Sequence, residues 1–186
     1  MMIIIGITGT LGAGKGTLVD YLKENKGFLH FSVRDFLVEE LKLQNMQVNR
    51  DTMTSLANEL RANNSPSYVT DQLYEQALAT GKNSIIESIR TPGEITSLKE
   101  KGDFYLFAVD ADPKIRYKRI SLRKSATDNI DFNTFISSEQ REMTAIDPNK
   151  QNISKCIEQA DFVFDNNGDL DKLYKQLISV LDKLNI

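Results

Sequence analysis

The chain has 186 residues, a formal net charge of −3, one cysteine (Cys156) and one histidine (His30). The length suits a single domain over residues 1–186, and the charge argues against a general nucleic-acid-binding protein, which would usually be basic. The cysteine count excludes an internal disulfide, and the histidine count disfavours a multi-histidine metal site. His30 lies in the apolar run of residues 28–31, so we expect it to have a structural role. The opening apolar run is too short for a signal peptide or membrane span, and we expect a cytoplasmic protein without membrane partners.

The first predicted element is an apolar β-type run, Ile4 to Thr8, which ends at once in a glycine-rich loop. Glycines allow backbone N–H groups to converge on an anion, because a Cβ would block the approach. A helix starting near Gly14 would add unpaired N–H groups, and Lys15 would reach the β- and γ-phosphates of a nucleotide. The pattern predicts a P-loop that binds a nucleoside triphosphate. Its residues are Gly9, Thr10, Leu11, Gly12, Ala13, Gly14, Lys15, Gly16 and Thr17.

Strands and helices alternate along the rest of the chain. Short apolar runs predict strands at Phe28 to Ser32, Asn83 to Ser88, Phe104 to Val109 and Phe162 to Phe164. Three helical patterns separate the second strand from the third, which indicates a helical insert over residues 33–81. We therefore expect an α/β fold, with a five-stranded parallel sheet covered by helices on both faces. Ligands of such sheets bind at the carboxyl ends of the strands.

Several arginines follow the predicted strands, as phosphoryl transfer requires cations and Mg²⁺ around the phosphates. Arg90 comes directly after the third strand. Arg116, Arg119 and Arg123 lie three and four residues apart, so they share one helix face. They precede a polar stretch whose composition suggests a lid over residues 123–134. We expect Lys15, Arg90, Arg119 and Arg123 to act in catalysis, with a solvated helix face as the alternative for the helical arginines.

Three acidic residues also follow predicted strands. Glu87 is the first candidate for holding Mg²⁺ or its waters, and Asp110 is its rival. Gly16 stands where a serine or threonine usually follows the P-loop lysine, so Thr17 is the remaining loop hydroxyl for the metal. Asp35 could orient or deprotonate an acceptor hydroxyl, or serve as a helix cap.

These residues resemble the P-loop nucleoside and nucleotide kinases, on the adenylate-kinase and dephospho-CoA-kinase side. The Gly-Lys-Gly-Thr of residues 14–17 is similar to the adenylate kinase loop, which also has glycine after the lysine. Glu87 and Arg90 stand where that family has an aspartate and the arginine that holds the acceptor phosphate, and Arg119 and Arg123 resemble its paired lid arginines. Residues 160–168 look instead like dephospho-CoA kinases, in which the last strand and loop lie beside the adenine.

The resemblance implies an ATP- and Mg²⁺-dependent kinase with a small nucleotide acceptor. A (deoxy)nucleoside monophosphate is the first candidate for this acceptor. The insert would hold the acceptor, with Arg34, Arg61 and Arg90 on its anionic group. Dephospho-CoA is the alternative acceptor, and its ribose hydroxyl would make Asp35 useful as a base. A regulatory ATP-binding module that transfers nothing also stays open. A GTPase is disfavoured because its motifs would stand in the wrong order, and the sequence does not indicate the oligomeric state.

Overall fold

The computed structural model of the chain describes residues 2–123 and 130–186. Within these ranges the strands form one sheet in the order β2-β3-β1-β4-β5, and every neighbouring pair is parallel. The predicted five-stranded parallel sheet is thereby confirmed. The strands are β1 (Ile4–Gly9), β2 (Leu29–Ser32), β3 (Ser84–Glu87), β4 (Phe104–Asp110) and β5 (Phe162–Asp165).

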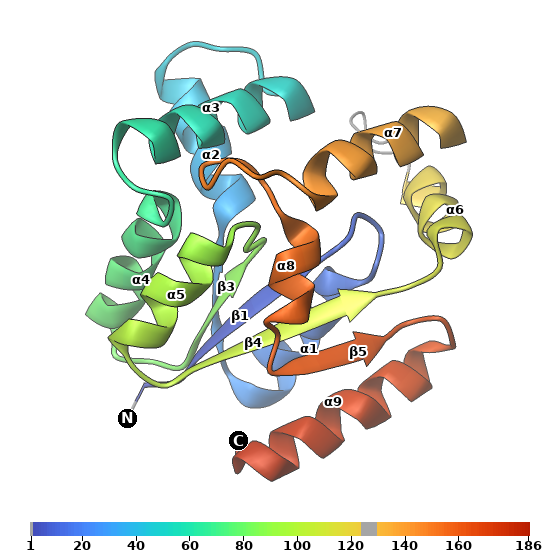
Figure 1. Cartoon of the computed structure of the whole chain (residues 1–186). Coiled ribbons are helices and arrows are strands. Elements are labelled where there is room, and N and C mark those ends of the chain that lie inside the picture. The colour runs from blue at the N-terminus through green and yellow to red at the C-terminus, as the bar shows by residue number, and fades with distance from the viewer. Residues whose placement is uncertain (1, 124–129) are drawn as a thin grey trace.

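Helices connect the strands and cover both faces of the sheet (Figure 1). In chain order, the helices of the described residues are α1 (Lys15–Lys26), α2 (Val33–Leu43), α3 (Arg50–Asn63), α4 (Tyr68–Thr80), α5 (Pro92–Lys101), α6 (Pro113–Arg123), α7 (Phe132–Met143), α8 (Ile153–Glu158) and α9 (Leu170–Leu184).

Local sequence explains where several helices begin. Gly14 has a left-handed conformation directly before α1, and α1 ends at Gly27, which is also left-handed. Thr91 and Glu94 form a capping box at the start of α5, with Pro92 at the first helical position.

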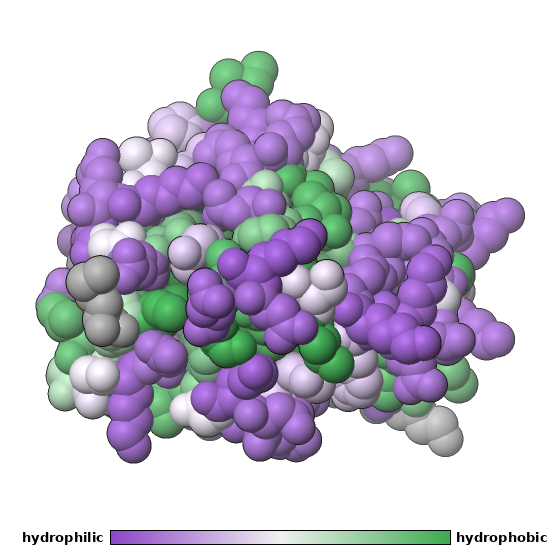
Figure 2. Space-filling model, turned by 90° about the horizontal axis from the view of Figure 1, so that it is seen from below, coloured by the Kyte–Doolittle hydropathy of each residue, from purple (hydrophilic) through white to green (hydrophobic). Residues whose placement is uncertain are grey.

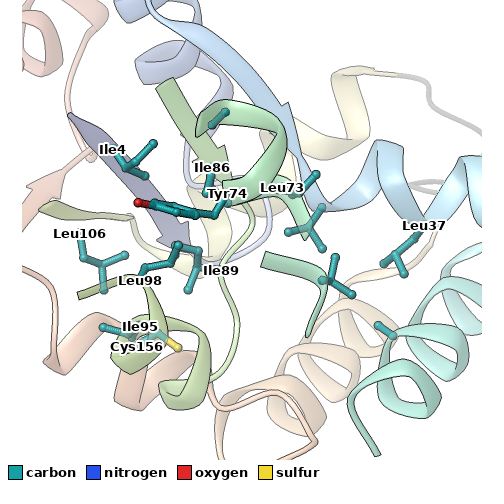
Figure 3. Packing of buried hydrophobic residues seen from close by; sticks show 14 of the residues in the cluster. Ile4, Leu37, Leu73, Tyr74, Ile86, Ile89, Ile95, Leu98, Leu106 and Cys156 are labelled. Atoms are coloured by element: carbon teal, nitrogen blue, oxygen red, sulfur yellow. The ribbon is translucent and has the colours of Figure 1, made fainter. Parts of the chain in front are cut away.

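Two apolar clusters lie on opposite faces of the sheet. Side chains alternate along β1, so that Ile5 and Ile7 face α1 and α9, whereas Ile4 faces the other cluster. The second cluster gathers residues from α2, α3, α4, α5 and α8, and Figure 3 shows Ile4, Ile86 and Leu106 of the sheet packed with Tyr74 and Cys156. Burial raises the pKa of the Cys156 thiol, so it is a packing group rather than a reactive one.

Helices α2, α3 and α4 make up the connection from β2 to β3, at the positions of the predicted insert. In Figure 1, α3 and α7 lie above the sheet, beyond the carboxyl ends of the strands. The predicted lid, residues 123–134, includes residues 124–129, which lie outside the described ranges. Its described residues belong to the end of α6 and the start of α7, where Asp131 caps the helix through Thr134.

Hydrophilic residues cover most of the face seen from below, and hydrophobic residues are interspersed between them (Figure 2). Among residues 2–123 and 130–186, no helix combines the length and apolar character that crossing a membrane requires.

Candidate active site

The glycine-rich loop connects β1 to α1 and has a backbone that other residues could not adopt without strain. Gly12 and Gly14 have φ values of 79° and 110°. A Cβ at Gly12 would come within 2.7 Å of the carbonyl oxygen of Arg116, and a Cβ at Gly14 would collide with the amide of Asn166. Gly16, in contrast, has open space around it. The loop is thus closely fitted to its surroundings at two glycines, and it leaves backbone N–H groups for an anion.

Lys15 is the first residue of α1 and its side chain lies across this loop. The ammonium Nζ donates to the carbonyl oxygens of Gly9 and Thr10, at 2.9 Å each. Burial, and next the charge of Arg90, lower the pKa of Lys15 to about 8, although Glu87 acts in the opposite direction. The cationic side chain and the glycine-lined backbone fit the phosphates of a nucleoside triphosphate.

Asp110, the rival candidate for the metal, is engaged in holding the P-loop. Its Oδ1 accepts from Thr10 Oγ1 at 2.7 Å and from the Ala111 N–H at 2.9 Å. Arg116 lies 3.6 Å from the same carboxylate and donates to the Leu11 carbonyl oxygen. Arg116 is buried, and it forms an ion pair with Glu139 of α7. The structure therefore places Arg116 as a tie between α6, α7 and the P-loop.

Glu87 ends β3 and is half-buried beside His30, whose Nε2 lies 3.1 Å from Glu87 Oε2. Burial raises the pKa of Glu87, but the His30 hydrogen bond and the charges of Lys15 and Arg90 outweigh it, so the pKa lies below its ordinary value. Glu87 is therefore an anion next to the P-loop lysine. Thr17 lies half-buried in the first turn of α1, and a metal role for Thr17 and Glu87 stays a prediction.

A cavity of about 160 Å³ opens beside the P-loop, and Leu11 of the loop is part of its wall. Its apolar wall is formed by Val33, Leu37, Met53 and Ala57 of α2 and α3. Four arginines line the same space, namely Arg34, Arg50, Arg61 and Arg90. Such a lining, apolar on one side and cationic on the other, suits a small molecule that carries an anionic group.

Arg90 follows β3 and is held from both its backbone and its side chain. The Arg90 N–H donates to Glu94 Oε2 at 2.7 Å, and the Arg90 carbonyl oxygen accepts from the Asn152 N–H at 2.8 Å. Its guanidinium Nη1 donates to Glu142 Oε2 at 2.8 Å and to Gln151 Oε1 at 2.6 Å. Arg50, at the start of α3, donates to Glu142 Oε1 at 2.6 Å through Nη2. Glu142 of α7 thus bridges two arginines of the cavity.

Arg61, predicted to bind the acceptor, is 2% exposed and forms an ion pair with Glu94 at 2.9 Å. Its Nη1 has no hydrogen-bond partner among the described residues, and the side chain lines the cavity. The structure therefore gives Arg61 a definite structural partner, while its predicted contact with an acceptor stays a prediction.

The remaining predicted residues lie around the P-loop or at the cavity rim. Arg119 donates to the Asn166 carbonyl oxygen at 2.9 Å, and Asn166 Nδ2 donates to the Ala13 carbonyl oxygen at 2.7 Å. The loop after β5 is thereby attached to the P-loop. Arg123, the last residue of α6, is exposed, and its charge contributes to the lowered pKa of Lys15. Asp35 is exposed in the first turn of α2 and does not line the arginine cavity.

Sequence reasoning missed several residues of the cavity. Arg50, Glu142 and Gln151 come from α3, α7 and the segment before α8, and Ser88 follows β3 with a φ of 75°. In the sequence, Arg50 lies 92 residues from Glu142 and 101 residues from Gln151, so no motif connects these three residues.

The fold is that of P-loop kinases. It is similar to TT1252 from Thermus thermophilus, with a TM-score of 0.64, 20% identity and coverage of 99% of this chain and 98% of that one. It is also similar to shikimate kinase from Bacteroides thetaiotaomicron, with a TM-score of 0.63, 14% identity and full coverage of both chains (100% each). A gluconokinase from Sinorhizobium meliloti has a TM-score of 0.61 at 12% identity, over 98% of this chain and 93% of its own.

The sequence matches the family described as AAA domain over residues 5–147, and the chain belongs to that family. A UPF0200 protein of Methanococcus vannielii is 29% identical over 186 residues, which cover 98% of this chain and 97% of the relative. A UPF0200 protein of Pyrobaculum aerophilum is 24% identical, over 99% of both chains.

Proposed function

We propose that the protein is an ATP-dependent kinase that transfers the γ-phosphoryl group to a small nucleotide, with a (deoxy)nucleoside monophosphate as the first candidate acceptor. The observation that supports this most directly is that the P-loop and the arginine-lined cavity adjoin, with Leu11 belonging to both. A donor phosphate held by the loop would lie beside an acceptor anion held by the arginines. Transfer between two such groups depends mainly on positioning and charge neutralisation.

In this proposal the residues of the P-loop hold the ATP phosphates, and Lys15 moves its donated hydrogen bonds from Gly9 and Thr10 to phosphate oxygens. Mg²⁺, when bound, would neutralise phosphate charge, and Thr17 and Glu87 are the candidate residues to hold it or its waters. Arg119 and the loop at Asn166 would lie on the nucleotide side, and Arg123 would add a cation to the transferring group. Exclusion of water by the segment over residues 123–134 belongs to the same proposal.

An anionic acceptor is favoured over a neutral hydroxyl acceptor by the four arginines of the cavity. A phosphate is already a nucleophile, so no general base is needed. Asp35, the candidate base for dephospho-CoA, is exposed and outside the cavity wall. Dephospho-CoA remains the second acceptor to test. The loop after β5, which resembles that of dephospho-CoA kinases, contacts the P-loop through the hydrogen bond from Asn166 to Ala13. Shikimate and gluconate join the panel, since kinases of those names share the fold.

An acceptor screen tests the proposal. The protein is mixed with ATP, Mg²⁺ and, in turn, each nucleoside monophosphate, dephospho-CoA, shikimate or gluconate, and ADP formation is measured. We expect acceptor-dependent ADP with at least one nucleoside monophosphate. Slow ADP formation that is indifferent to every acceptor would refute the kinase and leave the regulatory ATP-binding module.

The site assignment has its own test. Lys15→Ala should lower turnover by orders of magnitude without unfolding the protein, because Lys15 is a loop charge. Lys23→Ala, on the exposed side of the same helix, is the matched control and should retain turnover. A Lys15→Ala protein with normal turnover would contradict the assignment.

A cytoplasmic location, where ATP is available, is part of the proposal.

A further inference from the structure

Glu142 lines the arginine cavity and contacts two of its arginines. Its Oε1 accepts from Arg50 Nη2 at 2.6 Å and from Arg50 Nε at 3.2 Å, and its Oε2 accepts from Arg90 Nη1 at 2.8 Å. The three side chains come from α7, α3 and the segment after β3, so only the folded chain brings them together. Two arginines that grip one carboxylate from two sides form the arrangement that also binds a phosphate.

The charges of the cavity are not balanced by its acidic residues. Its lining contains four arginines, namely Arg34, Arg50, Arg61 and Arg90, and one acidic residue, Glu142. Glu94, which is not part of the lining, forms an ion pair with Arg61. Arg61 is 2% exposed and its Nη1 is itself buried, so this side chain adds charge to the cavity wall without offering an open donor. The side chains of Arg50 and Arg90 are 28% and 27% exposed, and they are the arginines that a ligand can reach.

We infer that Glu142 is an internal competitor that takes the place of the acceptor's anionic group on Arg50 and Arg90, and that the acceptor must displace it. This inference rests on the proposed function and assigns to Glu142 the role of lowering the affinity of the acceptor site for anions. The displacement imposes the same free-energy penalty on every anion. A phosphate dianion, with three acceptor oxygens for several arginines, overcomes the penalty, whereas a monocarboxylate only exchanges one carboxylate for another.

The displaced side chain has a place to go. Glu142 and Arg50 also line a second cavity of about 400 Å³, whose lining includes Arg141, Lys150 and Asp51. Because Glu142 borders both cavities, rotation of its side-chain torsions is the movement that the displacement requires. Arg141 and Lys150 would then offer the carboxylate new cationic partners.

A general-base role for Glu142 fits the structure less well. Burial raises the pKa of Glu142, but the charges of Arg90 and Arg50 and their hydrogen bonds outweigh it, so the pKa lies below the ordinary value. A carboxylate held by two arginines is a weak base. Glu142 therefore serves as the counter-ion of Arg50 and Arg90, and an acceptor phosphate would replace it as that counter-ion.

Anion binding tests the inference without requiring the natural acceptor. The P-loop is first saturated with Mg²⁺ and the non-hydrolysable ATP analogue AMP-PNP, so that a second anion reports on the arginine cavity. Inorganic phosphate and acetate are then titrated by calorimetry at pH 7.5 into the wild type, Glu142→Gln and Glu59→Gln. Glu59→Gln is the matched control, because it removes the same charge from an exposed position on α3, the helix that carries Arg50, and Glu59 does not line the cavity.

We expect Glu142→Gln to bind phosphate about tenfold more tightly than the wild type, a change of about 1.4 kcal/mol. Acetate affinity should rise by the same factor, because the penalty is common to both anions. Glu59→Gln should bind both anions as the wild type does. If Glu142→Gln fails to fold, Glu142→Asp serves instead, since its shorter side chain cannot bridge both arginines and should also strengthen phosphate binding.

Unchanged or weaker phosphate binding by Glu142→Gln would overturn the inference and show that Glu142 positions the arginines. The same outcome for Glu142→Asp would overturn it too. Failure of the proposed function is seen separately. A wild-type protein that binds AMP-PNP but forms no ADP with any acceptor contradicts the kinase, while the comparison of phosphate affinities between variants still decides the role of Glu142.

Discussion

Lys15 and Glu87 belong to one charged cluster in which each group shifts the pKa of the other. Burial lowers the pKa of Lys15 to about 8, and Arg90 adds to the shift. Glu87 stays ionised because His30, Lys15 and Arg90 favour its charge over the effect of burial. A bound triphosphate would bring several negative charges to Lys15 and raise its pKa again. Nucleotide binding and protonation of Lys15 are therefore linked.

This linkage predicts how nucleotide affinity depends on pH. Below about pH 8 Lys15 is charged with or without nucleotide, and this group contributes no pH dependence. Above that pH the free protein loses the proton and must regain it on binding, so the affinity falls by up to about tenfold per pH unit. Calorimetric titration of AMP-PNP from pH 6.5 to 9.5 measures this decline. Lys15→Ala should bind weakly with a flat profile, and a flat wild-type profile would contradict the linkage.

The buried pair Arg61–Glu94 gives a second prediction at the scale of residues. Arg61→Met leaves the Glu94 carboxylate, which also accepts from the Arg90 and Thr91 N–H groups, without its cation in the core. We expect a loss of about 3–5 kcal/mol in the free energy of unfolding, measured with urea. The double variant Arg61→Met/Glu94→Gln should recover part of it, because the uncompensated charge is gone. A single-variant loss below about 1 kcal/mol would show that the pair contributes little.

Single residues show where prediction from sequence stops. Lys15 was predictable, because its whole context lies within nine consecutive residues of one motif. The partners of the arginines were not, since Glu94 is 33 residues from Arg61 and Glu142 is 92 residues from Arg50. Neither helical periodicity nor a local motif connects such positions. They meet only because the topology brings α3, α5 and α7 around one cavity.

At the scale of elements, the strands were the most predictable part of the chain. Each apolar run lies in the sheet within one or two residues of its predicted bounds, because the runs are short, apolar and flanked by turn residues. The last helix has a clear apolar stripe, and its Leu173, Leu177 and Leu181 pack into the core as that stripe predicts. The order of the strands in the sheet came from the structure.

We expect substitution by alanine to have opposite effects on stability at two glycines of the P-loop, Gly14 and Gly16. Gly14→Ala places a Cβ against Asn166 at a φ of 110°, so we expect a loss of several kcal/mol or a displaced loop, with AMP-PNP binding impaired. Gly16→Ala adds a Cβ in open space within the first turn of α1, and should raise stability by up to about 1 kcal/mol. Thermal unfolding and AMP-PNP titration check both variants. A Gly16→Ala protein that unfolds earlier than the wild type would contradict the prediction.

At the scale of the whole molecule, the order and direction of the strands bring the residues of the candidate active site together. The parallel strands bring their carboxyl ends to one edge, so residues near positions 9, 87 and 110 become neighbours. Helices α3 and α7 lie above that edge (Figure 1) and add Arg50 and Glu142. A net charge of −3 thus coexists with a cavity lined by four arginines and by one acidic residue, Glu142. The overall charge gave no sign of this cationic site.

This division between a nucleotide side and an acceptor side predicts a pattern of amide hydrogen exchange across the chain. Mg²⁺ and AMP-PNP should slow exchange in the P-loop, residues 9–17, and in the loop after β5, which Asn166 connects to Ala13. Inorganic phosphate added on top should slow exchange at the start of α3 and around Arg90 instead, since its contacts are in the arginine cavity. Mass spectrometry of peptic peptides resolves these segments, and α9, on the far face of the sheet, serves as the internal control. Protection by AMP-PNP alone at the start of α3, with none in residues 9–17, would reverse the two sides and contradict the assignment of donor and acceptor.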